Sequence, residues 1–192
     1  MTFIALEGGE GSGKSTQARL LAEALGAALT HEPGGTEIGR IIRGIVLDPA
    51  TVGLDARAEA LLMLADRAQH VATVIRPALE GGRAVVTDRF SGSTLAYQGY
   101  GRGLDVDALA ATSRWASGGL EPDVIVLLDV AVGRMAGVPD RMESEEAAFH
   151  VRVVEGYRAL AAADPDRWVV IDGSGTVDEV AALVLKAVHE RL

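Results

Sequence analysis

A glycine-rich stretch near the N-terminus restricts the fold of this chain more than any other feature. Residues 8–15 match the spacing G-x-x-x-x-G-K-[ST], an apolar run precedes them at residues 3–6, and residues 15–25 have helical periodicity. Strand, glycine-rich turn and helix in this order build a phosphate-binding loop, because backbone N–H groups and the positive helix N-terminus surround a polyphosphate. The residues expected at the phosphates of a nucleoside triphosphate are Gly8, Gly9, Glu10, Gly11, Ser12, Gly13, Lys14, Ser15 and Thr16.

The side chains of this loop predict phosphoryl chemistry. Lys14 supplies a mobile positive charge for the β- and γ-phosphates, and the Ser15 hydroxyl is a ligand for Mg²⁺. A second strand-like run ends in Asp88 and Arg89. Ligands of open α/β sheets bind at the carboxyl ends of the strands, so we expect Asp88 beside the loop, binding Mg²⁺ through water. Arg89 is then expected to point towards the group that accepts the phosphoryl.

Short β-rich runs alternate with longer helical patterns along the whole chain. We expect strands at residues 3–6, 27–30, 84–87, 124–128 and 169–171, and helices at 15–25, 37–47, 54–79, 106–117, 145–163 and 176–192. This alternation predicts the α/β three-layer class, a five-stranded parallel sheet flanked by helices on both faces. No repeat or linker divides residues 1–192, so we expect a single domain.

Composition excludes several classes of function. The 192 residues carry a net charge of −9 without a Lys- or Arg-rich run, which argues against nucleic acid or an anionic membrane as a partner. Without cysteine, the chain has no disulfide, thiolate metal site or cysteine nucleophile, and its four scattered histidines suggest no histidine metal site. No signal peptide or membrane-length apolar run is visible, so we expect a cytoplasmic protein.

Two of the expected helices carry apolar patterns that bear on packing. In the helix at residues 37–47, we expect Ile38, Ile41, Ile42 and Ile45 to form the core face. In the helix at residues 54–79, the stretch 60–65 is apolar nearly all the way round, which is typical of a helix buried on more than one side. One side would be the sheet and the other a partner subunit, so we expect a homodimer.

Four further motifs give the chain a family resemblance. They are EPGGT at residues 32–36, ADRAQH at 65–70, DRF at 88–90 and LAYQGYGRG at 95–103. In the same order and at similar spacing, they resemble bacterial thymidylate kinases, with a similarity that runs from residue 3 to about residue 172. The resemblance implies a P-loop NTPase fold, a mobile lid at about residues 131–144, and transfer of the ATP γ-phosphoryl group to dTMP with Mg²⁺, giving dTDP.

Carried over position by position, the resemblance also implies roles for single residues. Glu10 lies near the sugar 3′-hydroxyl, Arg43 and Arg89 hold the dTMP phosphate, and Arg67 contacts a thymine carbonyl. The implied substrate-binding residues are Glu32, Arg43, Met63, Arg67, Arg89, Ser93, Thr94, Tyr97 and Gln98. The implied catalytic residues are Lys14, Arg89, Arg141 and Glu10. Because the acceptor is already an anionic phosphate oxygen, positioning and charge neutralisation suffice and no strong general base is required.

The chain departs from the family pattern in three places. His31 replaces the usual arginine before the EPGGT motif, and Met63 replaces the aromatic residue that stacks on thymine. The lid segment is several residues short, and Arg134 and Arg141 remain to supply the lid's catalytic arginine. Arg141 aligns naturally before residues 142–143, whereas Arg134 is also placed to stack on adenine. We expect such a short lid to close less completely and to turn over slowly.

Other functions stay open on the sequence alone. Met63 makes a related P-loop nucleoside monophosphate kinase with a different base preference an alternative. The short lid makes a catalytically weak, nucleotide-binding paralogue another. A GTPase switch is disfavoured, because the chain has no Asn-Lys-x-Asp sequence to recognise guanine.

Overall fold

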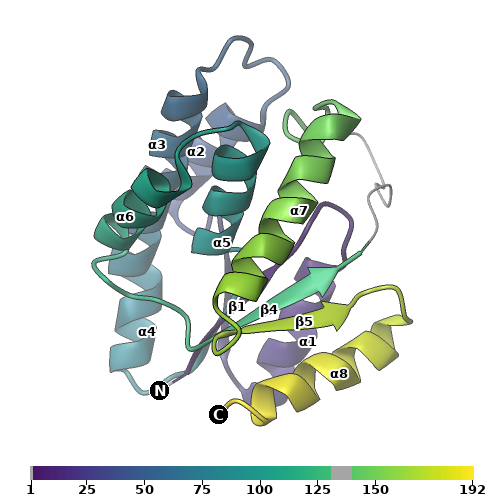
Figure 1. The fold of residues 1–192 in the computed structure, drawn as a ribbon. Helices are drawn as coiled ribbons and strands as arrows, with labels where there is room; N and C mark the ends of the chain where they lie inside the picture. The colour runs from purple at the N-terminus through teal and green to yellow at the C-terminus, as the bar shows by residue number, and fades with distance from the viewer. Residues whose placement is uncertain (1, 131–139) are drawn as a thin grey trace.

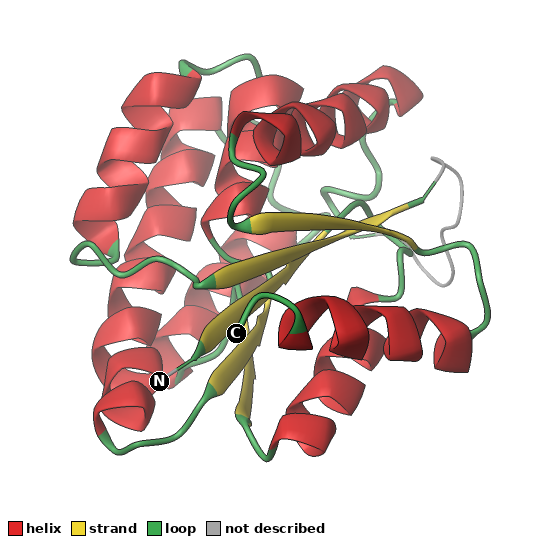
Figure 2. Ribbon diagram, turned by 60° about the horizontal axis from the view of Figure 1, so that its bottom comes forward, coloured by secondary structure: helices red, strands yellow, loops and turns green. Residues whose placement is uncertain are grey.

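Five parallel strands form one sheet in the computed structural model, which describes residues 2–130 and 140–192. In spatial order the strands are β2 (Ala28–His31), β3 (Val85–Asp88), β1 (Phe3–Glu7), β4 (Val124–Asp129) and β5 (Trp168–Asp172). Each lies within one residue of its predicted position. Helices cover both faces of the sheet (Figures 1 and 2), which confirms the three-layer α/β architecture.

Alternation along the strands divides the core between the two faces. On one face, Ile4 and Leu6 of β1 pack against Leu21 of α1 (Lys14–Leu25) and Val184 of α8 (Val177–His189). On the other face, Phe3 and Ala5 pack against Val71 and Ile75 of the long helical segment at residues 56–80. On the same face, β4 and β5 pack against α7 (Ala147–Ala163). Fully buried parallel strands are apolar on both faces, which explains their short continuous hydrophobic runs.

The strand register brings the carboxyl ends of three neighbouring strands together. Asp88 of β3 pairs with Leu6 of β1 on one side and with His31 of β2 on the other. The loop after β1 and the loops after β2 and β3 therefore leave the sheet at the same edge. The phosphate-binding loop, the EPGGT loop and the Asp88–Arg89 pair meet there, as expected for an open α/β sheet.

The helices differ from their predicted boundaries in two regions. The expected helix at residues 54–79 begins at Ala56 and comprises α3 (Ala56–His70), a π-helical turn η1 (Val71–Ile75) and α4 (Arg76–Glu80). Asp55 fixes its start, because the Asp55 carboxylate accepts N–H bonds from the first helical turn. Two elements were not predicted at all: the short helix α5 (Ser91–Thr94) and a second π-helical segment, η2 (Leu95–Gly101).

The expected core face of α2 (Glu37–Leu47) was wrong for three of its four isoleucines. Ile38, Ile41 and Ile45 are 52%, 67% and 41% exposed, and the buried positions are Gly39, Ile42 and Val46. The helix packs against α3, and the three exposed isoleucines are outside the buried face of Gly39, Ile42 and Val46. On α3, the apolar stretch is buried at Ala60 and Leu64, but Leu61 is 62% exposed.

The remaining helix, α6 (Val106–Ala116), packs against α3 and completes the group of helices on the left of Figure 1. Among the described residues, none of the helices combines the length and the apolar character that a membrane crossing requires.

Candidate active site

The loop between β1 and α1 folds around the Lys14 ammonium group. The Lys14 Nζ donates to the Gly9 carbonyl oxygen at 2.6 Å and to Ser12 Oγ at 3.2 Å. Gly8 has a φ of 147°, and a Cβ there would lie 2.6 Å from the Leu128 carbonyl oxygen, so no larger residue fits. Burial, together with the charge of Arg89, lowers the pKa of Lys14 to about 8. An incoming polyphosphate would stabilise the charged form.

Ser15 and Asp88 meet at the mouth of this loop, as the sequence predicted. Ser15 Oγ donates to Asp88 Oδ2 at 2.5 Å, and the other carboxylate oxygen, Asp88 Oδ1, is buried without a hydrogen-bond partner. An unpaired buried carboxylate oxygen beside a hydroxyl offers the hard oxygen ligands that Mg²⁺ prefers. Within residues 2–130 and 140–192, no group of three or more His, Cys, Asp or Glu side chains is arranged to hold a metal. Mg²⁺ usually keeps several waters and substrate phosphates as ligands, so the two oxygens of Ser15 and Asp88 are a sufficient protein contribution.

Arg89 is held in an unusual backbone conformation and makes an extensive hydrogen-bond network. Its φ of 72° is the one positive value among the described non-glycine residues, a strained conformation often found at functional sites. Arg89 Nη2 donates to Glu10 Oε1 at 2.6 Å and to the Tyr97 hydroxyl at 3.1 Å. Burial alone would raise the pKa of Glu10, but the charges of Arg89 and Lys14 lower it to about 2. Glu10 and Arg89 are therefore both charged at neutral pH.

Glu7 supports this network and was missed at the level of sequence. It is fully buried at the end of β1, and it accepts the backbone N–H groups of Phe90 and Ser93 and the hydroxyl of Ser93. Burial raises the pKa of Glu7. By binding the first N–H groups of α5, Glu7 holds the segment that follows Arg89 against the sheet. An acidic residue ending an otherwise apolar strand was the available signal.

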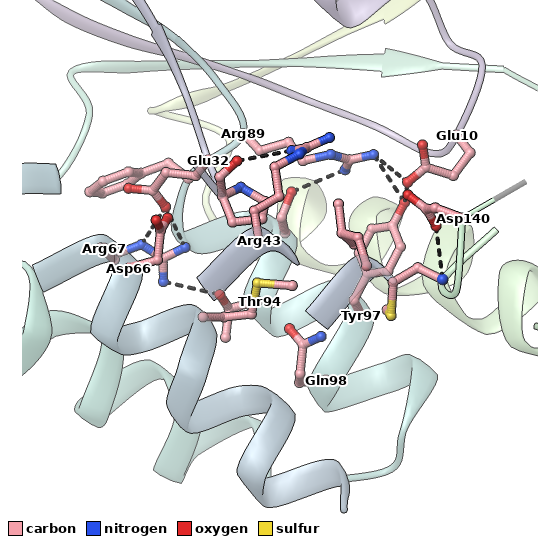
Figure 3. Close-up of a pocket in the computed structure, with 16 residues that line it drawn as sticks. Glu10, Glu32, Arg43, Asp66, Arg67, Arg89, Thr94, Tyr97, Gln98 and Asp140 are labelled. Atoms are coloured by element: carbon pink, nitrogen blue, oxygen red, sulfur yellow. Dashed lines mark hydrogen bonds and ion pairs between the residues drawn. The ribbon is translucent and has the colours of Figure 1, made fainter. Parts of the chain in front are cut away.

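A cavity beside the phosphate-binding loop brings the predicted substrate-binding residues together (Figure 3). All nine line it: Glu32, Arg43, Met63, Arg67, Arg89, Ser93, Thr94, Tyr97 and Gln98. Arg67 is 2% exposed, and its guanidinium donates to Glu32 at 2.9 Å and to Thr94 Oγ1 at 3.0 Å. Residues from α2, α3, η2 and the EPGGT loop, far apart in the sequence, thus form one pocket.

Asp66 also lines this cavity, although the sequence pattern did not single it out. Its Oδ1 accepts the backbone N–H of Gly34 at 3.1 Å, while its Oδ2 is buried without a partner. Burial, followed by the charge of Glu32, raises the pKa of Asp66 to about 6. A Cβ on Gly39 would clash with Asp66 Oδ1, so glycine at this position lets α2 approach the carboxylate. Asp66 therefore connects α3 to the EPGGT loop and to α2.

A larger cavity lies along the phosphate-binding loop and adjoins the first. It is lined by Gly11, Gly13, Lys14, Ser15 and Thr16, and by Asp88. The two cavities have four lining side chains in common, namely Glu10, Glu32, Arg43 and Arg89. A phosphate bound at this shared wall would contact groups from both cavities.

The two arginines expected from the lid have different outcomes. Arg134 and residues 131–139 of the expected lid lie outside the described residues. Arg141 lines neither cavity; its Nε donates to the Val46 carbonyl oxygen at 2.7 Å and its Nη2 to Glu59 Oε2 at 2.5 Å. Glu59 was not predicted, although Glu59, Met63 and Arg67 follow one another at the four-residue spacing of a single helix face.

Comparison with known proteins agrees with this geometry. The family model described as thymidylate kinase matches residues 6–184. The thymidylate kinase of Desulfovibrio desulfuricans is 48% identical, over 99% of this chain and 96% of the relative, and that of Solidesulfovibrio magneticus is 49% identical, over 99% and 100%. The crystal structure of thymidylate kinase from Ehrlichia chaffeensis superposes with a TM-score of 0.84 at 32% identity, covering 97% of this chain and 98% of that one. The chain belongs to the thymidylate kinase family.

Proposed function

We propose that this protein transfers the γ-phosphoryl group of ATP to dTMP, giving dTDP. The observation that carries the proposal is the shared wall of the two cavities, where Glu10, Glu32, Arg43 and Arg89 face both the phosphate-binding loop and the predicted nucleotide pocket. Two ligands bound in adjoining cavities have their phosphates close together, which a direct phosphoryl transfer requires. Family membership favours dTMP as the acceptor over the alternatives of another base or a catalytically weak paralogue.

In this mechanism the chain positions two anions and neutralises their charge. Lys14 and the N–H groups of the loop bind the ATP phosphates, and Arg43 and Arg89 hold the phosphate of dTMP. Glu10, kept ionised by Arg89 and Lys14, is the partner for the sugar hydroxyl of the acceptor. No general base is needed, because the attacking phosphate oxygen is already anionic at neutral pH. A catalytic arginine from the lid is proposed from the family resemblance alone. Its two candidates are Arg134 and Arg141.

Mg²⁺ is the proposed cofactor, with Ser15 and Asp88 as the residues that would hold it. Asp88 Oδ1 is buried and has no hydrogen-bond partner among the described groups, and Ser15 Oγ lies 2.5 Å from Asp88 Oδ2. When bound, Mg²⁺ neutralises charge on the transferred phosphoryl group. Asp88 and Ser15 contribute by fixing where that charge is placed.

The test is ATP consumption by the purified protein with Mg²⁺ and dTMP, dUMP, dCMP, dGMP or no acceptor. We expect a strong preference for dTMP, and loss of turnover in Lys14→Ala with the fold intact by circular dichroism. A preference for another monophosphate would contradict the proposed substrate. Tight dTMP binding without turnover, in single-turnover mixing, would contradict the proposed reaction.

We further propose that the protein is a homodimer formed through α2, α3 and α6. These helices lie side by side in Figure 1, and each carries an exposed large apolar side chain: Ile41 at 67%, Leu61 at 62% and Trp115 at 80%. Apolar side chains grouped on neighbouring helices are typical of subunit contacts. Light scattering should give twice the 20.0 kDa chain mass. Ile41→Glu should give the monomer, whereas Leu183→Glu on the exposed side of α8 should stay dimeric; a monomeric wild type would contradict the proposal.

A further inference from the structure

The amide group of Gln98 is oriented by a buried carboxylate. Gln98 lies on η2, is 1% exposed and lines the nucleotide cavity, and Figure 3 shows its amide end pointing into that cavity. Gln98 Nε2 donates to Glu59 Oε1 at 2.9 Å. Glu59 itself lies on α3 and is fully buried. The two residues connect the helix that carries Arg67 with the segment that carries Tyr97.

This contact allows one orientation of the amide. An ionised carboxylate accepts hydrogen bonds and donates none, so Gln98 has to present its NH₂ group to Glu59 and keep its carbonyl oxygen on the other side. Glu59 is ionised at neutral pH: burial would raise its pKa, but hydrogen bonds from Arg102, Gln98 and Arg141 lower it. Within the described part of the chain, no group donates a hydrogen bond to Gln98 Oε1. This oxygen is therefore available as an acceptor for a ligand.

A fixed acceptor distinguishes pyrimidine bases by the atom at position 3. Thymine and uracil carry an N–H there, which donates to a carbonyl oxygen, whereas cytosine carries an unprotonated nitrogen that needs a donor. With the amide free to rotate, Gln98 would offer either group and discriminate poorly. A site built to pair one hydrogen-bonding group rejects the ligand that leaves this group unpaired.

We propose that Glu59 is the positioning residue that sets the base preference of the pocket, by holding Gln98 as an acceptor for the N3–H group of the base. This inference rests on the proposed function for the identity of the substrate. It assigns to Glu59 no contact with the nucleotide and no part in phosphoryl transfer. The charge of Glu59 is required, since a neutral side chain of the same shape would both accept and donate.

The experiment is Glu59→Gln, assayed for kcat/KM with dTMP, dUMP and dCMP. The new amide donates to Gln98 Oε1 and allows Gln98 to present its NH₂ group to N3 of cytosine. We expect the dTMP-to-dCMP ratio of kcat/KM to fall by about tenfold or more. The dTMP-to-dUMP ratio should stay unchanged, because these bases differ by a methyl group and share the N3–H.

Two further variants separate this effect from damage to the pocket. Glu59 also accepts from Arg102 and Arg141, so a purely structural role would lower kcat/KM for all three acceptors by the same factor, and that result would overturn the inference. In a Gln98→Leu background, Glu59→Gln should leave the dTMP-to-dCMP ratio where Gln98→Leu alone puts it, since the two residues act as one unit. Additive changes in the cycle would also overturn it.

The Glu59→Gln variant retains part of the ion-pair network around position 59, which favours folding. Arg102 keeps an ion pair with Glu145 at 2.6 Å when Glu59 is neutral, which limits the charge left unpaired. If Glu59→Gln alone does not fold, Glu59→Gln combined with Arg102→Leu removes one carboxylate and one of its two arginine partners, so the net charge of the group is unchanged. Arg102→Leu alone is then the control for the ratio. The wild type is measured first: absence of dTMP turnover there contradicts the proposed function, whereas an unchanged ratio in the variant contradicts the role of Glu59.

Discussion

Replacing Asp66 by asparagine should change how the stability of the ligand-free protein depends on pH. The Asp66 side chain is buried against the EPGGT loop, and its pKa is raised from 3.8 to about 6 by burial and by Glu32. Since this pKa is higher in the folded than in the unfolded chain, the protonated carboxyl stabilises the fold at low pH. That stabilisation is lost as the pH rises through about 6. Asparagine is neutral at every pH and keeps an oxygen that accepts the Gly34 N–H.

The magnitude follows from the difference between the two pKa values. A shift from 3.8 to about 6 corresponds to about 3 kcal/mol between the fully protonated and the fully ionised protein. Most other carboxyl groups titrate below pH 5, so the two proteins are best compared between pH 5 and pH 7. In that window the Asp66 contribution falls by about 1.3 kcal/mol. The stability of wild type relative to Asp66→Asn should therefore fall by this amount between pH 5 and pH 7.

Urea unfolding followed by circular dichroism at several pH values measures this difference directly. Titrations of other groups occur in both proteins and cancel in the comparison. Asp166→Asn, at an exposed aspartate, is the matched control, and its stability relative to wild type should not change with pH. A wild-type-minus-Asp66→Asn difference that is constant, or that increases, from pH 5 to 7 would refute the reasoning.

Three further substitutions have effects that the structure predicts. Arg89→Lys should lower kcat/KM for dTMP by about 100-fold or more, because an ammonium group does not reproduce the planar set of donors to Glu10 and Tyr97; activity within threefold of wild type would contradict this. Ser15→Ala should raise the Mg²⁺ concentration needed for half-maximal rate, which a magnesium titration at fixed ATP checks. Gly156→Ala places a Cβ 2.6 Å from the Tyr100 ring and should destabilise the protein by about 1–3 kcal/mol in urea, whereas Gly44→Ala, with nothing within 4 Å, should not destabilise it.

The fold was predictable because local patterns and tertiary packing agree over most of the chain. Strands buried on both faces read as short apolar runs, and the phosphate-binding loop fixed the first strand and helix. The segment 91–101 failed because its helical turns contain three glycines and depend on a distant partner, the buried carboxylate of Glu7, for their first N–H bonds. Periodicity also misplaced Ile38 and Ile41, since an apolar stripe is the same whether it faces the core or the surface.

The candidate site was also predictable only in part from the sequence. Family resemblance identified nine residues that the fold brings to one cavity, although their convergence was invisible in helical spacing. Three buried carboxylates, those of Glu7, Glu59 and Asp66, went unnoticed because an acidic residue in a helix or strand is normally solvated. Their partners come from segments 32 to 86 positions away. Contacts at that sequence separation are set by the tertiary structure and leave no local pattern.

The pairing of Arg67 and Arg89 with carboxylates has a consequence for how nucleotides bind. Arg89 is paired with Glu10 and Arg67 with Glu32, and the described lining of the nucleotide cavity holds four carboxylates against three arginines, so this cavity offers little uncompensated positive charge to the surrounding water. The chain as a whole carries −9, and nucleotides are anions. The negative chain therefore repels an approaching nucleotide at long range. The nucleotide is attracted only at short range, where its phosphate replaces a carboxylate as the partner of an arginine. Dissolved salt screens the repulsion, so association should accelerate with ionic strength, the reverse of the behaviour of proteins that draw phosphates in with basic surfaces.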